Sequence, residues 1–198
     1  MVLGSQLTDI TATEVARKLR AKEVSPLDVL DAAIERIEEV NPKVNALPIL
    51  CLDQARERAI KLSQTVASGD KCGPLFGLPI AVKDYNDLAG VRTTYGSPIF
   101  ANHKVDRSDA TVLKLEAAGA IPVGKSNVPE WAGAHTFNPV FGHTLNPWDA
   151  RLSAGGSSGG SAVALATGMV WLATGNDLRG SLPVPASFTS GPGLRPRP

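Results

Sequence analysis

Cysteine and aromatic residues are scarce in this chain, and neither sign of charge is in excess. The only two cysteines, Cys51 and Cys72, form no CxxC pair, which argues against a zinc ribbon and a disulfide scaffold. The 20 basic and 19 acidic residues leave a net charge of +1, so the chain lacks the basic surplus of nucleic-acid-binding proteins. We therefore expect a reduced, cytoplasmic protein that does not contact nucleic acid directly.

The sequence also lacks a long apolar run and a targeting signal. Its longest apolar stretch, residues 161–174, contains Gly168 and falls short of the ~20 residues that span a bilayer. The first ten residues, MVLGSQLTDI, show no basic region followed by an apolar core, so we expect no signal peptide. With 43% hydrophobic and 20% charged residues, the composition is that of a globular protein with no membrane partner.

Segments typical of helices and strands alternate along most of the chain. Residues 11–40 have the apolar spacing of two helices. Further helices are expected at 53–66, 109–118 (capped by Ser108) and 161–167, and strands at 46–52 (a sheet edge), 79–82, 120–123 and 170–173. This alternation predicts an α/β fold with a largely parallel sheet.

Prolines predict several of the element boundaries. Ser25-Pro26 should open the second helix, because proline is tolerated at the first helical position, and Asn41-Pro42 should end it. The last 18 residues hold five of the 15 prolines, so we expect them to continue neither a central strand nor a helix.

One segment matches the phosphate-binding-loop motif but lacks its structural context. Residues 119–126 fit GxxxxGK[ST], but the apolar residues inside the match form a strand of their own, and Pro129 follows at once. We therefore expect no nucleotide here. Lys125 should point to solvent or to a neighbouring group.

A match to the α/β-hydrolase nucleophile motif fails as well. Residues 155–159 fit GxSxG, but in that fold a histidine follows the serine, and the last histidine of this chain, His143, precedes it. His103, His135 and His143 also lack the spacing of metal ligands, so no metal and no cofactor are expected.

Three separate segments together carry the residues of a nucleophilic site. IAVKD ends in Lys83-Asp84, SAGGSSGGSA contains Ser157 and Ser158, and GNDLRGS ends in Ser181. The glycine–serine run is followed directly by an apolar helical segment, which argues against a flexible linker. The three segments therefore supply an amine base, a relay hydroxyl and a nucleophile.

With these stretches, the sequence resembles the amidase signature family of serine hydrolases from about Gly73 to Pro196. Further matching stretches are GPLFGLPIAVKD, GVRTTYGS, SDATVLKLEAAGAIPVGKSNVPEW and HTFNPVFGHTLNPWD. The resemblance implies a mixed sheet flanked by helices, incomplete at its C-terminal side. Residues 1–70 would form an N-terminal helical segment of the same domain, and residues 71–198 a truncated signature core.

The resemblance also implies a Ser–cis-Ser–Lys triad that cleaves the C–N bond of a small-molecule amide through an acyl-enzyme. Lys83 would be the base, Ser157 (after a cis peptide bond) the relay, and Ser181 the nucleophile. Burial would keep the lysine neutral by disfavouring its charged form. The remaining implied roles are an oxyanion hole from the backbone N–H groups of Leu178, Arg179, Gly180 and Ser181, with Ser158 and Asp177 in support.

Around Ser181 the sequence departs from the family pattern GTDxGGS. Arg179 stands where a glycine is expected, so a left-handed backbone there would be strained and the side chain would crowd the oxyanion hole. Asn176 replaces threonine, and Pro183 replaces a basic residue. Family members are also more than twice as long, so we expect an exposed sheet edge that favours self-association.

Two alternatives stay open beside an active amidase. One is a catalytically impaired fragment that serves as a binding or structural module. The other is the amidase subunit of a glutamyl-tRNA amidotransferase, which works only with partner subunits. We rank this last one lowest, because the stretch HTFNPVFG is more like that of stand-alone amidases.

Overall fold

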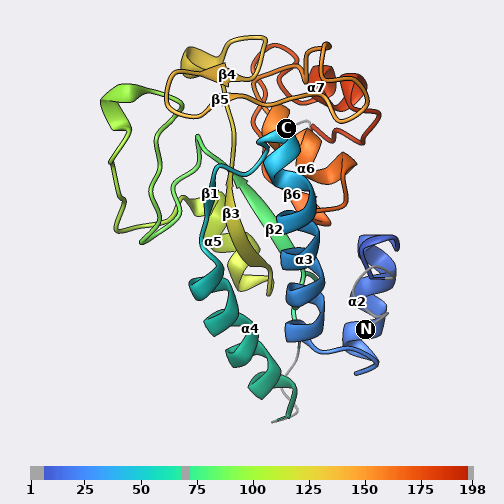
Figure 1. Ribbon diagram of the computed structural model, residues 1–198. Coiled ribbons are helices and arrows are strands. Elements are labelled where there is room, and N and C mark those ends of the chain that lie inside the picture. The colour runs from blue at the N-terminus through green and yellow to red at the C-terminus, as the bar shows by residue number, and fades with distance from the viewer. Residues whose placement is uncertain (1–6, 68–71, 196–198) are drawn as a thin grey trace.

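The computed structural model describes residues 7–67 and 72–195, and a four-stranded mixed sheet lies at the centre of this part (Figure 1). The strands, in their order across the sheet, are β1 (Ile49–Leu50), β3 (Ile121–Ser126), β2 (Pro79–Lys83) and β6 (Leu172–Ala173). β2 runs parallel to both β3 and β6, whereas β1 pairs antiparallel with β3 at one edge. The expected α/β fold is confirmed.

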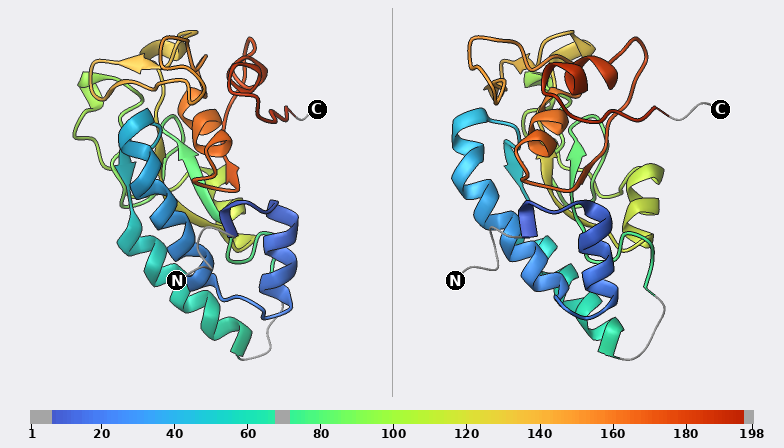
Figure 2. Two further views of the ribbon diagram at one scale, coloured as in Figure 1. Left: turned by 45° about the vertical axis from the view of Figure 1, so that its right-hand side comes forward. Right: turned by 90° about the vertical axis from the view of Figure 1, so that its right-hand side faces the viewer.

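Helices cover both faces of the sheet, as the turned views of Figure 2 show. The helices are α2 (Ala12–Arg20), α3 (Pro26–Val44), α4 (Leu52–Ala67), α5 (Ala110–Ala117), α6 (Gly159–Ala166) and α7 (Pro183–Phe188). Two short 3-10 turns, η1 (Pro98–Phe100) and η2 (Glu130–Ala132), and a small hairpin of β4 (Phe137–Asn138) and β5 (Gly142–His143) lie in the connecting segments. Among the described residues, no helix has both the length and the apolar character that a membrane crossing requires.

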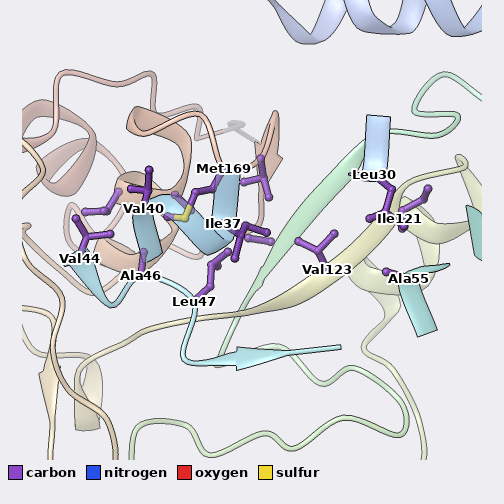
Figure 3. Close-up of a cluster of buried hydrophobic side chains, with 14 of the residues drawn as sticks. Leu30, Ile37, Val40, Val44, Ala46, Leu47, Ala55, Ile121, Val123 and Met169 are labelled. Carbon is purple, nitrogen blue, oxygen red and sulfur yellow. The ribbon is translucent and has the colours of Figure 1, made fainter. Parts of the chain in front are cut away.

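The side chains of β2 alternate between two hydrophobic clusters. Ala81 belongs to the cluster of α3, α4 and α6. Ile121 and Val123 of β3 lie in the same cluster (Figure 3). Ile80 and Val82 pack on the other side, in the cluster that contains α5. Because successive strand residues point to opposite faces, the residue after Val82 points to the face that α6 covers. That residue is Lys83.

The two expected N-terminal helices begin where the sequence predicts. The Thr11 side chain accepts the N–H of Glu14 at 3.2 Å and caps α2. Ser25 and Asp28 form a reciprocal capping box at the start of α3, with Pro26 in the first helical position. These caps satisfy N–H groups that have no partner inside the helix.

The predicted end of α3 at Asn41-Pro42 is wrong, because the helix continues to Val44. Pro42 lies in the last turn. The helix ends at Asn45, which adopts the left-handed conformation with φ 51°. The Asn41 side chain then accepts the N–H groups of the next two residues at 3.0 and 2.8 Å. The Asn41 side chain thus provides a hydrogen-bond acceptor for the backbone N–H groups just after the helix, and it does not end the helix.

Two further boundary predictions are corrected. Ser108 does not cap α5; its hydroxyl accepts the N–H of Ala89 at 2.9 Å, and Asp109 occupies the cap position. The proline-rich end was expected to contain no helix, yet α7 forms there. Pro183 and Pro185 both fall in its first turn, where a backbone N–H has no helical partner to lose.

Candidate active site

The chain end of β2 brings Lys83 against the two serines that precede α6. Lys83 is fully buried, and Ser157 and Ser158 are 1% and 2% exposed. The lysine Nζ donates to both serine Oγ atoms, each at 2.8 Å. The Gly156–Ser157 peptide bond is cis, as the family resemblance implies.

Glycines let α6 approach the sheet closely enough for these contacts. A Cβ on Gly159 would lie 2.2 Å from the Thr136 hydroxyl, and one on Gly160 would lie 2.3 Å from the backbone nitrogen of Asn127. Real side chains do not come this close to another atom, so a larger residue at either position would push the helix away. The glycine–serine run is therefore a close-packing element that sets the position of Ser157.

Lys83 has a third acceptor that the sequence does not predict. The Asn176 Oδ1 accepts from Nζ at 2.6 Å. Asn176 follows β6, and this neighbouring strand is fixed to β2 by the Lys83 N–H, which donates to the Thr174 hydroxyl at 2.7 Å. The only sequence signal was the replacement of a threonine by asparagine, which in itself does not indicate contact with a lysine ninety residues earlier in the chain.

Burial controls the protonation of Lys83. Desolvation disfavours the ammonium form and lowers the pKa of Lys83 to about 7, while the negative charge of Asp177 opposes this effect. The three Nζ partners among the described residues are neutral oxygens, so none of them is a counter-ion that would hold the proton on the amine. The ring of Tyr85 lies beside the amine, with Nζ 4.8 Å from its centroid. A large fraction of neutral amine near pH 7 follows from this environment.

Ser181 does not join Lys83 and Ser157 in this structure. It lies half-buried in the segment between β6 and α7, and among the described residues its hydroxyl makes no hydrogen bond. Its backbone N–H donates to Asp177 Oδ1 at 3.0 Å, and that of Gly180 donates to the same oxygen at 2.5 Å. The structure thus brings Lys83, Ser157 and Ser158 together, and leaves Ser181, the expected nucleophile, outside this group.

Two of the four backbone N–H groups expected to form the oxyanion hole, those of Gly180 and Ser181, donate instead to the Asp177 carboxylate. Burial acts to raise the pKa of Asp177, but N–H donation from Gly180, Ser181 and Leu182 outweighs it, and the pKa is lowered. The oxyanion-hole assignment of Leu178, Arg179 and Gly180 stays a prediction.

The strain anticipated at Arg179 is absent. Arg179 is not one of the described non-glycine residues with positive φ, and the left-handed position falls on Gly180, with φ 95°. Strain at Arg179 was expected only for a left-handed backbone, and the turn places that conformation one residue later, at Gly180. Arg179 is exposed to solvent.

A second buried lysine lies beside the first. Lys125 of β3 is fully buried and pairs with Asp84, its Nζ lying 2.8 Å from Oδ1 and 2.7 Å from the Thr93 hydroxyl. Thr94 donates its N–H and hydroxyl to the same carboxylate. Lys125 was expected to point either to solvent or to a neighbouring group. In the structure it points to a neighbouring group, Asp84. The pair fixes the backbone directly after Lys83.

The histidines and cysteines form no metal site in the described part of the chain. His135 bonds to Ser153 through Nδ1 at 2.7 Å and to His143 through Nε2 at 3.1 Å, but no group of three or more potential ligands occurs among the described residues. Cys51 and Cys72 are both free. Burial raises the pKa of Cys51 to about 12, so its thiol stays protonated at neutral pH.

Comparison with known proteins identifies the family. A family model described as Amidase matches residues 28–197. The chain belongs to the amidase family. The resemblance derived from the signature stretches is confirmed, and the amidase fold is confirmed by solved structures. Fatty acid amide hydrolase superimposes with a TM-score of 0.90 at 27% identity over 96% of this chain. A 6-aminohexanoate cyclic dimer hydrolase complexed with substrate has a TM-score of 0.83 at 32% identity over 91% of it.

The relatives of this amidase-family chain are considerably longer. Two of them are glutamyl-tRNA(Gln) amidotransferase subunits: that of Geobacillus thermodenitrificans is 46% identical over 192 residues, and that of Carboxydothermus hydrogenoformans 42% identical over 193 residues. Both alignments cover 96% of this chain but only 39% and 40% of the relative. The two solved structures are covered over 34% and 36% of their length. The chain thus spans about 40% of the length of the curated relatives it matches.

Proposed function

We propose that this chain carries the catalytic centre of an amidase-type serine hydrolase that cleaves the C–N bond of a small-molecule amide. The observation that carries the proposal is the buried Lys83, whose Nζ lies 2.8 Å from the hydroxyls of Ser157 and Ser158. A lysine acts as a base only when neutral, and the lowered pKa of Lys83, about 7, makes that form available.

In the proposed reaction, Lys83 Nζ takes the Ser157 proton while Ser157 Oγ takes the proton of Ser181. The Ser181 oxygen bonds to the amide carbonyl carbon, and backbone N–H groups near Gly180 stabilise the oxyanion. Collapse breaks the C–N bond, and the relay returns a proton to the leaving nitrogen. Water then hydrolyses the acyl-enzyme by the same proton path, which releases a carboxylic acid.

This relay requires Ser181 to come within hydrogen-bond distance of Ser157. Residues 176–182 lie in a segment without regular structure between β6 and α7, and the proposal requires this segment to rearrange. In the rearranged loop, the N–H groups of Gly180 and Ser181 would leave Asp177 and face the substrate.

A fluorophosphonate probe, which labels activated serines, tests the proposal on the full chain. We expect labelling of the unaltered protein and its loss in Ser181→Ala and Ser157→Ala. Ser187→Ala, which removes an exposed serine of α7, is the matched control and should label normally. Labelling that persists in Ser181→Ala would overturn the nucleophile assignment. A folded chain that does not label would instead support the impaired fragment that serves as a binding or structural module.

The curated relatives favour a second candidate, the amidase subunit of a glutamyl-tRNA(Gln) amidotransferase. They are named as subunits of that enzyme at 42% and 46% identity, which gives this alternative more weight than the stretch HTFNPVFG suggested. In this case we expect partner subunits to be needed for activity. Glutamine hydrolysis measured with and without the other subunits of the Geobacillus thermodenitrificans enzyme separates the two candidates, because a stand-alone amidase gains nothing from them.

A further inference from the structure

An open pocket of about 350 Å³ lies next to Tyr85, outside the serine–lysine cluster. Four aromatic side chains border it: Tyr85, Tyr95, Phe100 and Trp131. Tyr95 and Phe100 meet edge to face with their ring centroids 5.1 Å apart. Trp131 stands at the rim and is 79% exposed. An exposed tryptophan beside an apolar pocket is typical of a surface that meets a ligand.

The tyrosine hydroxyls bordering the pocket are already engaged. Tyr95 donates to Asp87 Oδ1 at 2.7 Å, and Tyr85 donates to the Pro129 carbonyl while it accepts the Ala132 N–H. Little hydrogen-bonding capacity is left to these hydroxyls. The pocket therefore offers a ligand mainly the edges and faces of its rings.

A carboxylate lies at the border of the pocket. The Glu130 side chain, half-buried at its border, has no hydrogen bond and no ion pair among the described residues. Burial, together with the charges of Asp84 and Glu130, raises the pKa of Tyr85 to about 12. Ring faces are themselves electron-rich. An anion is thus disfavoured here, and a neutral ligand would leave the carboxylate without a partner.

Backbone strain is concentrated around the same pocket. Six described non-glycine residues have positive φ, and three of them border it: Tyr95 at 52°, Trp131 at 57° and Ala132 at 57°. A bulky residue in this conformation is unfavourable unless its surroundings hold it there. Such strained positions gather at ligand-binding sites, and here they present the aromatic rings.

We propose that this pocket binds an organic cation with an apolar body, such as an alkylammonium or quaternary ammonium group. The aromatic rings attract the cation through their faces, and the Glu130 carboxylate supplies the opposite charge. This inference goes beyond the proposed amide hydrolysis and does not depend on it. Tyr85 lines the pocket and also contacts Lys83, whose Nζ lies 4.8 Å from the centroid of the Tyr85 ring.

Calorimetric titration of the full chain with choline and with 3,3-dimethylbutan-1-ol tests the proposal, since the two probes share a shape and differ in charge. We expect choline to bind about tenfold more tightly, because cation–π attraction and the nearby carboxylate act on it alone. The Trp131 indole N–H signal in NMR should shift during the titration, while those of Trp148 and Trp171 should not.

Two surface substitutions locate the interaction. Glu130→Gln should weaken choline binding about fivefold and leave the alcohol unchanged, and Trp131→Leu should weaken choline binding by a similar factor. Glu35→Gln, which removes an exposed charge of α3, is the matched control. Equal affinity for both probes, or choline binding that is insensitive to Glu130→Gln, overturns the proposal. Choline should still bind to Ser181→Ala, so failure of this inference is distinguishable from failure of the proposed hydrolase.

Discussion

Two lysines on neighbouring strands are equally buried but have different hydrogen-bond partners. Lys83 of β2 and Lys125 of β3 are both fully buried, and desolvation lowers the pKa of each. Lys125 faces the carboxylate of Asp84, which favours its charged form. Lys83 faces three neutral oxygens. Burial lowers the pKa of both lysines. The partner then determines whether the lysine is a charged structural group, as Lys125 is beside Asp84, or a candidate base, as Lys83 is.

The largest effect should come from Lys83→Met. Without the amine, no group accepts the Ser157 proton, and we expect fluorophosphonate labelling to fall at least about 100-fold. The fold should survive, because only neutral hydrogen-bond partners are released. Labelling rates test the expected loss of activity, and far-UV circular dichroism tests whether the fold is retained. Labelling at the original rate would show that Lys83 is not the base.

Lys125→Met should instead damage stability. It leaves the buried Asp84 carboxylate uncompensated, and we expect a loss of about 3–5 kcal/mol in the free energy of unfolding. Urea denaturation measures this loss. The double variant Lys125→Met/Asp84→Asn removes the orphaned charge and should recover part of the stability. If Lys83→Met proves as destabilising as Lys125→Met, the contrast between the two lysines fails.

Asn176→Asp should make Lys83 resemble Lys125. A carboxylate at this position favours the ammonium form and raises the pKa of Lys83 from about 7. A higher pKa means less neutral amine at a given pH, so the acid limb of the labelling profile should move to higher pH. Because Asn176 is exposed, we expect a shift of roughly one unit, or about tenfold slower labelling at pH 6. An unchanged pH profile would show that the residue at position 176 does not influence the pKa of Lys83.

The smallest effect concerns the edge of the sheet. β6 ends the strand order on the side away from β1, and its side chains are half-buried. We expect weak self-association through this edge, seen as a rise in mass with concentration in light scattering. Leu172→Lys should reduce that rise by placing a charge at the edge. A strictly monomeric protein at millimolar concentration contradicts the prediction.

Features fixed by local chemistry were predictable from the sequence. The Ser25 cap, the β2 strand and the serine segment all follow from neighbouring residues, and the family pattern adds the pairing of Lys83 with Ser157. The contacts of Asn176 and of Lys125 join segments far apart in the chain, and no single segment encodes them. The predictions at Pro42 and Pro183 were wrong because they rested on the presence of proline alone. The energetic cost of a proline depends on its position within the helix, and it is low in the first turn.

The narrow sheet has a consequence for hydrogen exchange. β2 is paired on both sides, whereas β1 and β6 are two-residue edges. Amides of β2 and β3 should therefore exchange only on global unfolding, and those of the segment around Ser181 by local opening. We therefore expect Lys83, the proposed base, to lie in the slowest-exchanging part of the molecule, and Ser181, the proposed nucleophile, in one of the fastest. In the proposed mechanism, the time needed to bring Ser181 to Ser157 is then set by the motion of residues 176–182 alone.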